Sequence, residues 1–397
     1  MADHILAILP SKGLGGGIER YWNWLRGVAE EGGATVDEQA LLGPGDIPSL
    51  QRKFRFAAQI FSAARKLRHL GSVDVIVVHP HMALLAWAAC RMSSLEPQTF
   101  TVIFHGTDVW SLSRMQNWAL ERVPMRAIAV SSFSSGALAP IGPSTIVPSG
   151  ISSSWYRLLA ASADVEGDAR VPVPAVQAVD SATVQVLTVF RLSESRGKGL
   201  PQIVDALDQV RGRTGVDIHL TVAGSGTLPD ESRGLVSTRG WITVFSGPSD
   251  DDLAALYHRA DIFVLATRTT FCPPYSGEGF GIVLIEAQLA GTPVIAPAHG
   301  GSDDAFLDGI TGVKPVDESA EALAEAIEPL ITDTELRHTF GANARAWSRT
   351  TFDPRRRNAH VRHLLGWDRN GTDRTASGVN DLGLSLTAPS EHLADPE

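Results

Sequence analysis

The feature that most constrains the fold is an alternation of short apolar runs with amphipathic segments, which occurs twice along the 397-residue chain. Short apolar runs of this kind are typical of the buried strands of a parallel sheet. Helical segments between such strands provide the crossovers that a parallel sheet requires. In the first half the strand candidates are residues 5–9, 73–78, 99–104, 127–130 and 145–147.

The alternation restarts near residue 185, so the chain is predicted to form two doubly wound α/β domains. Strand candidates in the second half are residues 185–190, 217–223, 262–266 and 293–296. The predicted divisions are an N-terminal domain over 1–155, a linker or insertion over 156–182 and a C-terminal domain over 183–350. Residues 351–367 are predicted to form a last helix, and the polar residues 368–397 a disordered tail.

Charge and cysteine content exclude several classes of protein. Lys and Arg number 34 against 44 Asp and Glu, a net charge of −10, so the chain lacks the positive field that nucleic-acid binding needs. Cys90 and Cys272 are too few for a disulfide framework and fit a reducing compartment, which predicts a cytoplasmic protein. The apolar run near the N-terminus is too short for a signal peptide, and no window has the length and apolarity of a transmembrane helix.

The most specific segment is residues 277–287, GEGFGIVLIEA, between two predicted strands. Its glycines allow close backbone approach to a ligand, and a helix beginning near Gly281 would point its free N–H groups and positive dipole end at that ligand. A diphosphate suits such a place. Glu278 lies before the helix and Glu286 about one turn inside it, so the two carboxylates can meet different parts of one ligand.

With two glutamates separated by seven residues, this segment resembles the signature of the retaining family 4 glycosyltransferases of GT-B fold. The flanking residues 260–264, 290–295 and 300–301 extend the resemblance. The resemblance implies two Rossmann-like domains facing a central cleft, with the nucleotide-sugar donor in the C-terminal half and the last helix crossing back to the first domain. It also implies that Glu278 contacts the donor sugar, that Glu286 holds the ribose, and that the donor is bound by Gly279, Phe280, Gly281, Ile282 and Val283.

A second cluster lies at the first strand-to-helix turn of the second half, where cations follow the end of a strand. Arg191 can grip a phosphate with its fork and Lys198 can act as a point charge. In family 4 the matching pair stabilises the departing diphosphate, although Phe190 stands where the family usually has glycine. Gly224, after the next strand, resembles a turn near the nucleotide base, but simple turn chemistry explains it equally well.

In the first half, Gly15, Gly16 and Gly17 join a strand to a helix. This is not the dinucleotide fingerprint, because Ile18 stands at the third glycine position. The loop resembles the family segment that closes over the donor phosphates, and a tight turn is compatible with that role. His105 follows the strand candidate 99–104 and matches the family histidine that faces the donor sugar, with a structural histidine as the alternative.

Three further features have simpler explanations. Asp108 is expected to form a local turn, and His79 and His81 alternate faces and make a poor metal pair. The Asp-x-Asp in residues 249–252 precedes a helical segment and is explained by N-capping. No metal and no cofactor are therefore expected.

Residues 52–70 form a predicted helix in which Phe and Ile interleave with Arg and Lys. Some family 4 enzymes dock on anionic membranes through such a helix, which would place the chain peripherally on the inner face of the membrane. The alternative is a helix packed on the core with a solvated cationic face.

The predicted function is transfer of a hexosyl group, of EC 2.4 type, from a UDP- or GDP-sugar to an acceptor hydroxyl with retained anomeric configuration. Polysaccharide or glycolipid assembly for the cell envelope is the leading context, with a lipid-linked, sugar or small-molecule acceptor. Glycosylation of a small secondary metabolite is the alternative. A phosphorylase or synthase of similar fold, and a non-catalytic nucleotide-sugar-binding protein, are less favoured.

Overall fold

The structure is a computed structural model that describes residues 3–161, 183–273 and 275–368. The greater part of the predicted linker, 162–182, and the predicted tail from residue 369 lie outside the described residues. The described residues within Met1–Ser152, Phe271–Tyr275 and Pro354–Leu382 form one compact unit. Those within Ser153–Thr270 and Ser276–Asp353 form a second.

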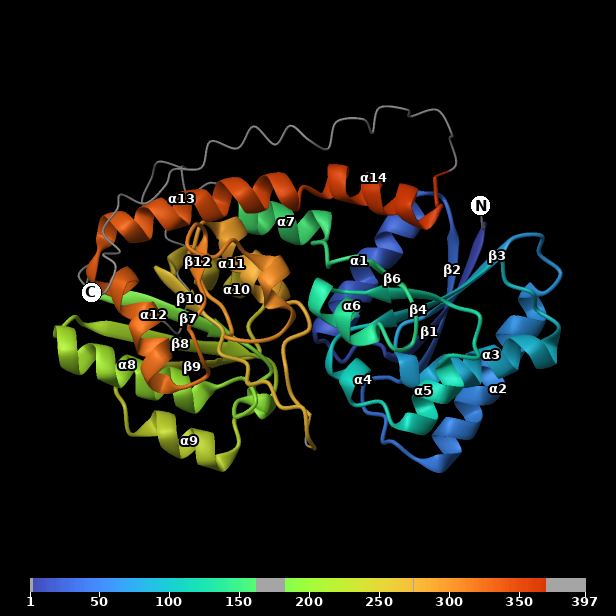
Figure 1. Cartoon of the computed structure of the whole chain (residues 1–397), viewed down its shortest axis with the longest axis horizontal. Helices are drawn as coiled ribbons and strands as arrows, with labels where there is room; N and C mark the ends of the chain where they lie inside the picture. The colour runs from blue at the N-terminus through green and yellow to red at the C-terminus, as the bar shows by residue number, and fades with distance from the viewer. Residues whose placement is uncertain (1–2, 162–182, 274, 369–397) are drawn as a thin grey trace. The chain divides into compact units, whose positions relative to one another are not determined.

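The first unit is built on a six-stranded, wholly parallel sheet with the order β2-β1-β3-β4-β5-β6 (Figure 1). Its strands are β1 His4–Ser11, β2 Thr35–Leu42, β3 Val73–Val77, β4 Thr99–Phe104, β5 Arg126–Ala129 and β6 Ser144–Ile146. Its helices are α1 Gly17–Glu31, α2 Leu50–Leu67, α3 Ala83–Ser93, α4 Thr107–Trp110, α5 Arg114–Leu120, α6 Ser132–Leu138 and α14 Pro354–Leu365, with a 3-10 turn η1 at Pro80–Met82.

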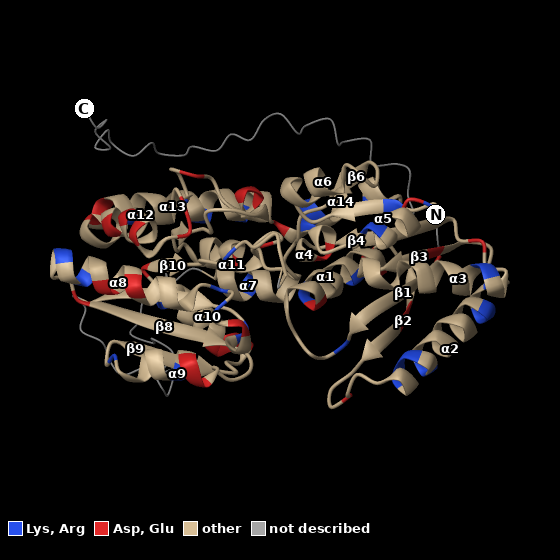
Figure 2. Ribbon diagram, turned by 60° about the horizontal axis from the view of Figure 1, so that its bottom comes forward, with Lys and Arg blue, Asp and Glu red and all other residues tan. Residues whose placement is uncertain are grey.

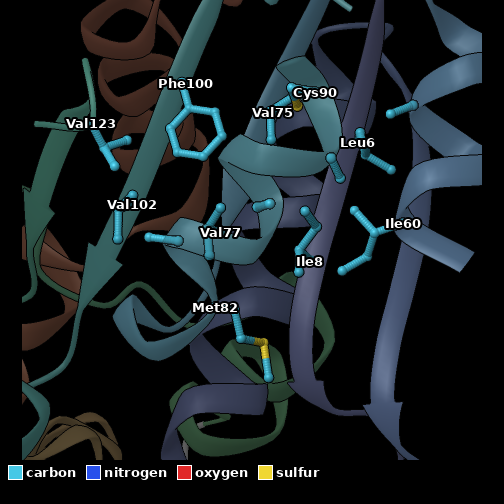
Figure 3. Close-up of a cluster of buried hydrophobic side chains, with 14 of the residues drawn as sticks. Leu6, Ile8, Ile60, Val75, Val77, Met82, Cys90, Phe100, Val102 and Val123 are labelled. Atoms are coloured by element: carbon cyan, nitrogen blue, oxygen red, sulfur yellow. The ribbon is translucent and has the colours of Figure 1, made fainter. Parts of the chain in front are cut away.

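Successive strand residues alternate between the two faces of this sheet, and both faces are buried. Figure 3 shows one face, where Leu6 and Val75 from the strands meet Ile60 of α2 and Cys90 of α3. Strands buried on both faces are what the continuous apolar runs predict.

Helix α14 follows the second unit in sequence but belongs to the first. Asn358 of α14 accepts from the Trp24 indole N–H of α1 at 2.9 Å and donates to Glu31 at 3.0 Å. Arg362 adds an ion pair with Glu31 at 2.9 Å. These bonds fix the end of the described chain on α1.

The second unit has its own six-stranded parallel sheet, with the order β12-β11-β10-β7-β8-β9. Its strands are β7 Val184–Val189, β8 Ile218–Gly224, β9 Ile242–Ser246, β10 Ile262–Val264, β11 Val294–Ile295 and β12 Gly312–Val313. Its helices are α7 Ser153–Ala160, α8 Leu200–Thr214, α9 Asp230–Ser237, α10 Asp250–Arg259, α11 Ile282–Ala290, α12 Ala320–Thr332 and α13 Thr334–Thr351, with 3-10 turns η2 at Leu192–Glu194 and η3 at Gly301–Ala305. Two doubly wound α/β units confirm the predicted fold class.

Several elements differ from the sequence prediction. Strands β2 and β9 were not predicted, because both are edge strands without a fully buried residue and therefore lack a continuous apolar run. Strand β12, also at an edge, was not predicted because it has only two residues. Residues 156–160 were predicted to lie in the linker but belong to helix α7, which is anchored in the second unit by a hydrogen bond from Tyr156 to the Arg349 carbonyl at 3.2 Å.

The strand orders fix where ligands are expected. In open α/β sheets, ligands bind beyond the carboxyl ends of the strands where the strand order reverses. That point lies between β1 and β3 in the first unit and between β7 and β10 in the second. Within the described part of the chain, no helix combines the length and apolarity needed to cross a bilayer.

Candidate active site

The turn between β7 and α8 carries Lys198 and lies against the end of β10. Gly199 has φ 75°, and a Cβ placed on it would be 2.0 Å from the Ala266 carbonyl oxygen. Arg268 N–H donates to the Gly197 carbonyl at 2.9 Å, which ties the same turn to the chain beyond β10. Lys198 is thereby held at the switch point of the second sheet.

Lys198 meets Glu278 and Thr267 in one compact cluster. Lys198 Nζ lies 3.0 Å from Glu278 Oε2, with side chains 22% and 14% exposed. The Thr267 hydroxyl donates to the same oxygen at 2.9 Å. The carbonyl of Glu278 accepts from Gly301 N–H at 2.7 Å, so both ends of the residue are fixed.

The environment of Glu278 keeps its carboxyl group ionised. Burial acts to raise its pKa, but the charge and hydrogen bond of Lys198, the Thr267 hydroxyl and the Gly281 N–H together outweigh it and hold the pKa below its usual value. An ionised carboxylate at this position can accept hydrogen bonds from a sugar hydroxyl.

Helix α11 begins directly after this cluster. Gly281 precedes it with φ 85°, in the left-handed region that favours glycine. Ile282 and Val283 open the helix, where backbone N–H groups have no acceptor within the helix. No acidic side chain stands in the first turn, so the positive dipole end is suited to a phosphate.

Two other predicted donor residues have structural roles. Phe280 is only 4% exposed and its ring centroid lies 6.5 Å from that of Phe352, so its side chain belongs to the core. Gly224 ends β8, where a Cβ would meet the Phe190 carbonyl oxygen at 1.7 Å. Gly279 lies between Glu278 and Phe280 in the loop that leads to α11.

Arg191 follows the end of β7, and its guanidinium forms an ion pair with Glu194. Its Nη1 is 2.8 Å from Glu194 Oε1, and both side chains are nearly half exposed. A phosphate could compete for this guanidinium at low energetic cost, because exposed ion pairs contribute little.

Glu286, predicted to hold the ribose, is fully buried on α11. Its Oε1 accepts from the Trp155 indole N–H at 2.9 Å and its Oε2 from the Tyr257 hydroxyl at 2.8 Å. With 0% of the residue exposed, the carboxylate offers no surface to a ligand in this structure. A ribose contact requires local movement of α7 or of these side chains.

In the first unit, the glycine loop after β1 donates hydrogen bonds to the carboxylate of Glu19. Glu19, in the first turn of α1, accepts from the N–H groups of Gly13 at 2.5 Å, Leu14 at 3.0 Å and Gly15 at 2.9 Å. Gly15 and Gly16 have φ 72° and 108°, and Gly17 is the first residue of α1. The loop therefore collects backbone N–H groups around a negative charge.

His105 follows β4 and is kept neutral. Its Nε2 donates to the Val78 carbonyl at 2.9 Å, as the carbonyl can only accept. Burial lowers its pKa to about 3 despite that hydrogen bond. The Asp108 carboxylate accepts the N–H of His105 at 2.9 Å and of Gly106 at 2.7 Å, which confirms the predicted local turn.

Of the other sequence features, the Asp-x-Asp is explained by capping. Ser249 Oγ accepts the Asp252 N–H at 3.1 Å and the Asp252 carboxylate accepts the Ser249 N–H at 3.2 Å, a capping box at the start of α10. His79 and His81 lie with ring centroids 4.8 Å apart, His79 Nδ1 accepting the His81 N–H.

The structure thus brings Lys198, Glu278 and the start of α11 together in the second unit, while Gly15–Gly17 and His105 follow β1 and β4 of the first. Sequence reasoning missed Thr267, Glu19, Trp155 and Tyr257. Thr267 had a usable signal, because it is the first polar residue after the apolar run 262–266 at the switch point. Trp155 and Tyr257 had none, since their partner is distant in sequence.

Known proteins resemble this chain in sequence and in fold. Residues 174–347 match the family model of the glycosyl transferases group 1. The GDP-mannose-dependent alpha-(1-6)-phosphatidylinositol monomannoside mannosyltransferase of Mycolicibacterium smegmatis is 27% identical over 318 residues, which are 76% of this chain and 79% of that protein.

Solved structures show the same fold at low sequence identity. A glycosyltransferase from Rickettsia africae gives a TM-score of 0.72 at 18% identity, over 92% of this chain and 99% of that one. Anabaena HepE, solved in complex with UDP and glucose, gives 0.68 at 18% identity, over 91% of this chain and 99% of that one. Residues 174–347 are thus similar to the group 1 glycosyltransferases, and the two parallel-sheet units have the GT-B fold.

Proposed function

We propose that the chain transfers a hexosyl group from a UDP- or GDP-sugar to an acceptor hydroxyl with retention of anomeric configuration. The observation that carries the proposal is the Lys198–Glu278–Thr267 cluster at the start of α11. It places an ammonium, an ionised carboxylate and free backbone N–H groups at one switch point. These groups suit the diphosphate and the sugar of one donor molecule.

In this proposal the diphosphate binds the backbone N–H groups of Ile282 and Val283 and also that of Gly281, which exchanges its bond to Glu278 for one to the phosphate. Lys198 and Arg191 neutralise the charge that grows on the diphosphate as the glycosidic bond breaks. Glu278 accepts hydrogen bonds from the sugar hydroxyls. Because the positive charge comes from side chains and the helix, we propose that turnover needs neither a divalent metal nor a cofactor. EDTA should leave the rate unchanged.

The departing phosphate oxygen accepts the proton of the acceptor hydroxyl on the face that it leaves, which retains the anomeric configuration. The Glu286 carboxylate holds the ribose once its Trp155 contact opens. We also propose that neutral His105 offers a ring nitrogen to a sugar hydroxyl and that the loop of Gly15, Gly16 and Gly17 contacts the donor phosphates. NMR of the product with a donor of known anomeric configuration tests retention, and an inverted product would overturn it.

We further propose that the acceptor is glycolipid or polysaccharide of the cell envelope, reached by peripheral docking on anionic membrane from the cytoplasm. Helix α2 has five cations and no acidic residue (Figure 2). Leu50 and Phe54 expose 73% and 74% of their surface beside Lys53 and Arg55. An apolar and cationic helix start of this kind suits a headgroup layer. The related mannosyltransferase is named for a phosphatidylinositol acceptor.

Two experiments test the proposal. A thermal-shift panel of UDP, GDP, ADP and their sugar conjugates should select one nucleotide, since a ligand at 100 times its dissociation constant adds about 2.7 kcal/mol of stability. Stabilisation in the wild type but not in Lys198→Met supports the donor site, and equal shifts in both would refute it.

Co-sedimentation with vesicles that contain or lack phosphatidylglycerol tests the docking. The double variant Lys53→Glu, Arg55→Glu should lose binding, whereas Arg211→Glu on α8 should keep it. Turnover of a water-soluble acceptor without vesicle binding favours a small metabolite as substrate instead.

A further inference from the structure

Residues 266–268, shortly after β10, contact both the Lys198 turn and Glu278. The carbonyl of Ala266 packs against Gly199 in the Lys198 turn, and Arg268 N–H donates to Gly197 in that turn. Between them, the Thr267 side chain turns the other way and donates to Glu278 Oε2. Thr267 is 2% exposed, so this hydroxyl is committed to the carboxylate rather than to water.

We propose that Thr267 is a positioning residue that fixes the Glu278 carboxylate for the donor sugar. The inference rests on the proposed function of Glu278. In the structure, Lys198 and Thr267 share Oε2, at 3.0 Å and 2.9 Å. The Gly281 N–H also donates to this carboxylate. A carboxylate can accept further hydrogen bonds beyond these, and a sugar hydroxyl can supply one.

Thr267 matters most once the donor is bound. A diphosphate attracts the Lys198 ammonium, because two phosphate charges compete with one carboxylate for it. The hydrogen bond from Lys198 to Glu278 then weakens. The Thr267 hydroxyl carries no charge for the diphosphate to attract, so its hydrogen bond to Glu278 is kept. It is the side-chain donor that continues to orient Oε2 through the reaction.

The chain offers a matched set of variants. Thr267→Val keeps the shape and removes the hydroxyl, and Thr267→Ser restores it. Thr188→Val is the control, because Thr188 is also fully buried, on β7, and its hydroxyl has no hydrogen-bond partner among the described residues. Each variant is made in the full chain and its melting temperature is recorded.

The expected result separates the sugar from the nucleotide. Thr267→Val should lower kcat/KM for the nucleotide sugar by about 10-fold to 100-fold, the range for one hydrogen bond to a charged group. Its dissociation constant for the free nucleoside diphosphate should stay within about twofold of wild type. Thr267→Ser should recover most of the rate, and Thr188→Val should match wild type throughout.

Two outcomes would overturn the inference. One is a normal kcat/KM in Thr267→Val while Glu278→Gln is inactive, which leaves the function of Glu278 intact and removes Thr267 from it. The other is an equal loss of nucleoside diphosphate binding in Thr267→Val, which indicates a general structural role. Full activity of Glu278→Gln would instead refute the proposed function itself.

Discussion

Asp108 of the first unit and Glu278 of the second are both largely buried carboxylates beyond the end of a parallel strand, yet their pKa values shift in opposite directions. Burial raises the pKa of Asp108 to about 6, although backbone N–H groups of His105 and Gly106 oppose it. Burial also acts to raise the pKa of Glu278, but the Lys198 ammonium reverses the outcome. The fold supplies burial to both sites, and the presence of a cation decides the direction in which the pKa shifts.

The residues beside Asp108 and Glu278 also differ in charge. His105 beside Asp108 has a pKa of about 3, so near neutral pH the first-unit turn presents an uncharged imidazole. The turn in the second unit presents an ion pair and a helix N-terminus. The first-unit turn therefore combines a carboxylate with a neutral imidazole, whereas the second-unit turn pairs its carboxylate with an ammonium. The turn that contains the ammonium is the one suited to a diphosphate.

Replacing Lys198 by methionine is the strongest way to break this contrast, because Glu278 then becomes a buried carboxylate without a cation, as Asp108 is. Turnover should fall by about 10²–10³-fold, the effect of losing one group that stabilises developing charge. The acid limb of kcat/KM against pH should move to higher pH, since the pKa of Glu278 is no longer held down.

Steady-state kinetics from pH 5 to pH 8 check both effects. Lys314→Met is the control, because its ion pair with Asp303 is solvent-accessible and distant in sequence from the cluster. A Lys198→Met enzyme with an unshifted acid limb would contradict the role of the ammonium.

Glu286 is a third buried carboxylate, and it accepts hydrogen bonds from the uncharged donors Trp155 and Tyr257. It can therefore show how much an uncharged donor contributes to the free energy of unfolding. Tyr257→Phe removes the hydroxyl that donates to Oε2 at 2.8 Å and keeps the ring packed on Phe263. The free energy of unfolding should fall by about 1–3 kcal/mol, the cost of an unmet buried group. Urea unfolding followed by circular dichroism measures it. No loss would mean that Glu286 is satisfied without Tyr257.

The contribution of neutral His105 to the free energy of unfolding can be tested by varying the pH. The unfolded chain binds this proton near pH 6.5 but the native protein only near pH 3, so the stability due to neutral His105 is present above pH 6.5 and lost as pH falls toward 3. Asp108 acts oppositely, since its contribution is full below pH 3.8 and lost as pH rises through about 6. His79, with a pKa of about 4, acts as His105 does.

In His105→Asn the loss of unfolding free energy between pH 6.5 and pH 4.5 should therefore be smaller than in wild type. Urea midpoints at pH 6.5, 5.5 and 4.5 measure that slope. The exposed His360 provides the matched substitution, His360→Asn, which should keep the wild-type slope. Equal slopes in wild type and His105→Asn would indicate that the native protein takes up this proton as readily as the unfolded chain.

The central strands of both sheets could be predicted from the sequence, because each is buried on two faces and therefore has a continuous apolar sequence. The prediction missed β2 and β9, since both are edge strands without a fully buried residue, and the sequence of β2, TVDEQALL, mixes charges with apolar residues. It also missed β12, which is only two residues long. It placed the linker too early, because α7 is only eight residues long and its hydrogen bonds to Glu286 and Arg349 join residues far apart in the chain.

For the candidate site, the spacing of Glu278 and the glycines predicted the helix start, because local sequence determines a helix terminus. Pairings across the sheet were not accessible in the same way. Nothing in the sequence says that Lys198 meets Glu278, 80 residues away, or that Thr267 shares the same oxygen. Such contacts depend on strand order, which brings the ends of β7 and β10 together.

The smallest expected effect comes from the exposed counterpart of the Lys198–Glu278 pair. Arg191 and Glu194 lie 2.8 Å apart, but with both side chains nearly half exposed their attraction is screened by water. Glu194→Gln should therefore change the free energy of unfolding by less than about 1 kcal/mol and leave Arg191 freer to meet a phosphate. Isothermal titration should show nucleoside diphosphate binding equal to wild type or a few-fold tighter. Weaker binding would mean that Glu194 positions Arg191 instead of competing for it, and that an exposed ion pair in this unit is as much a part of the donor site as the buried one.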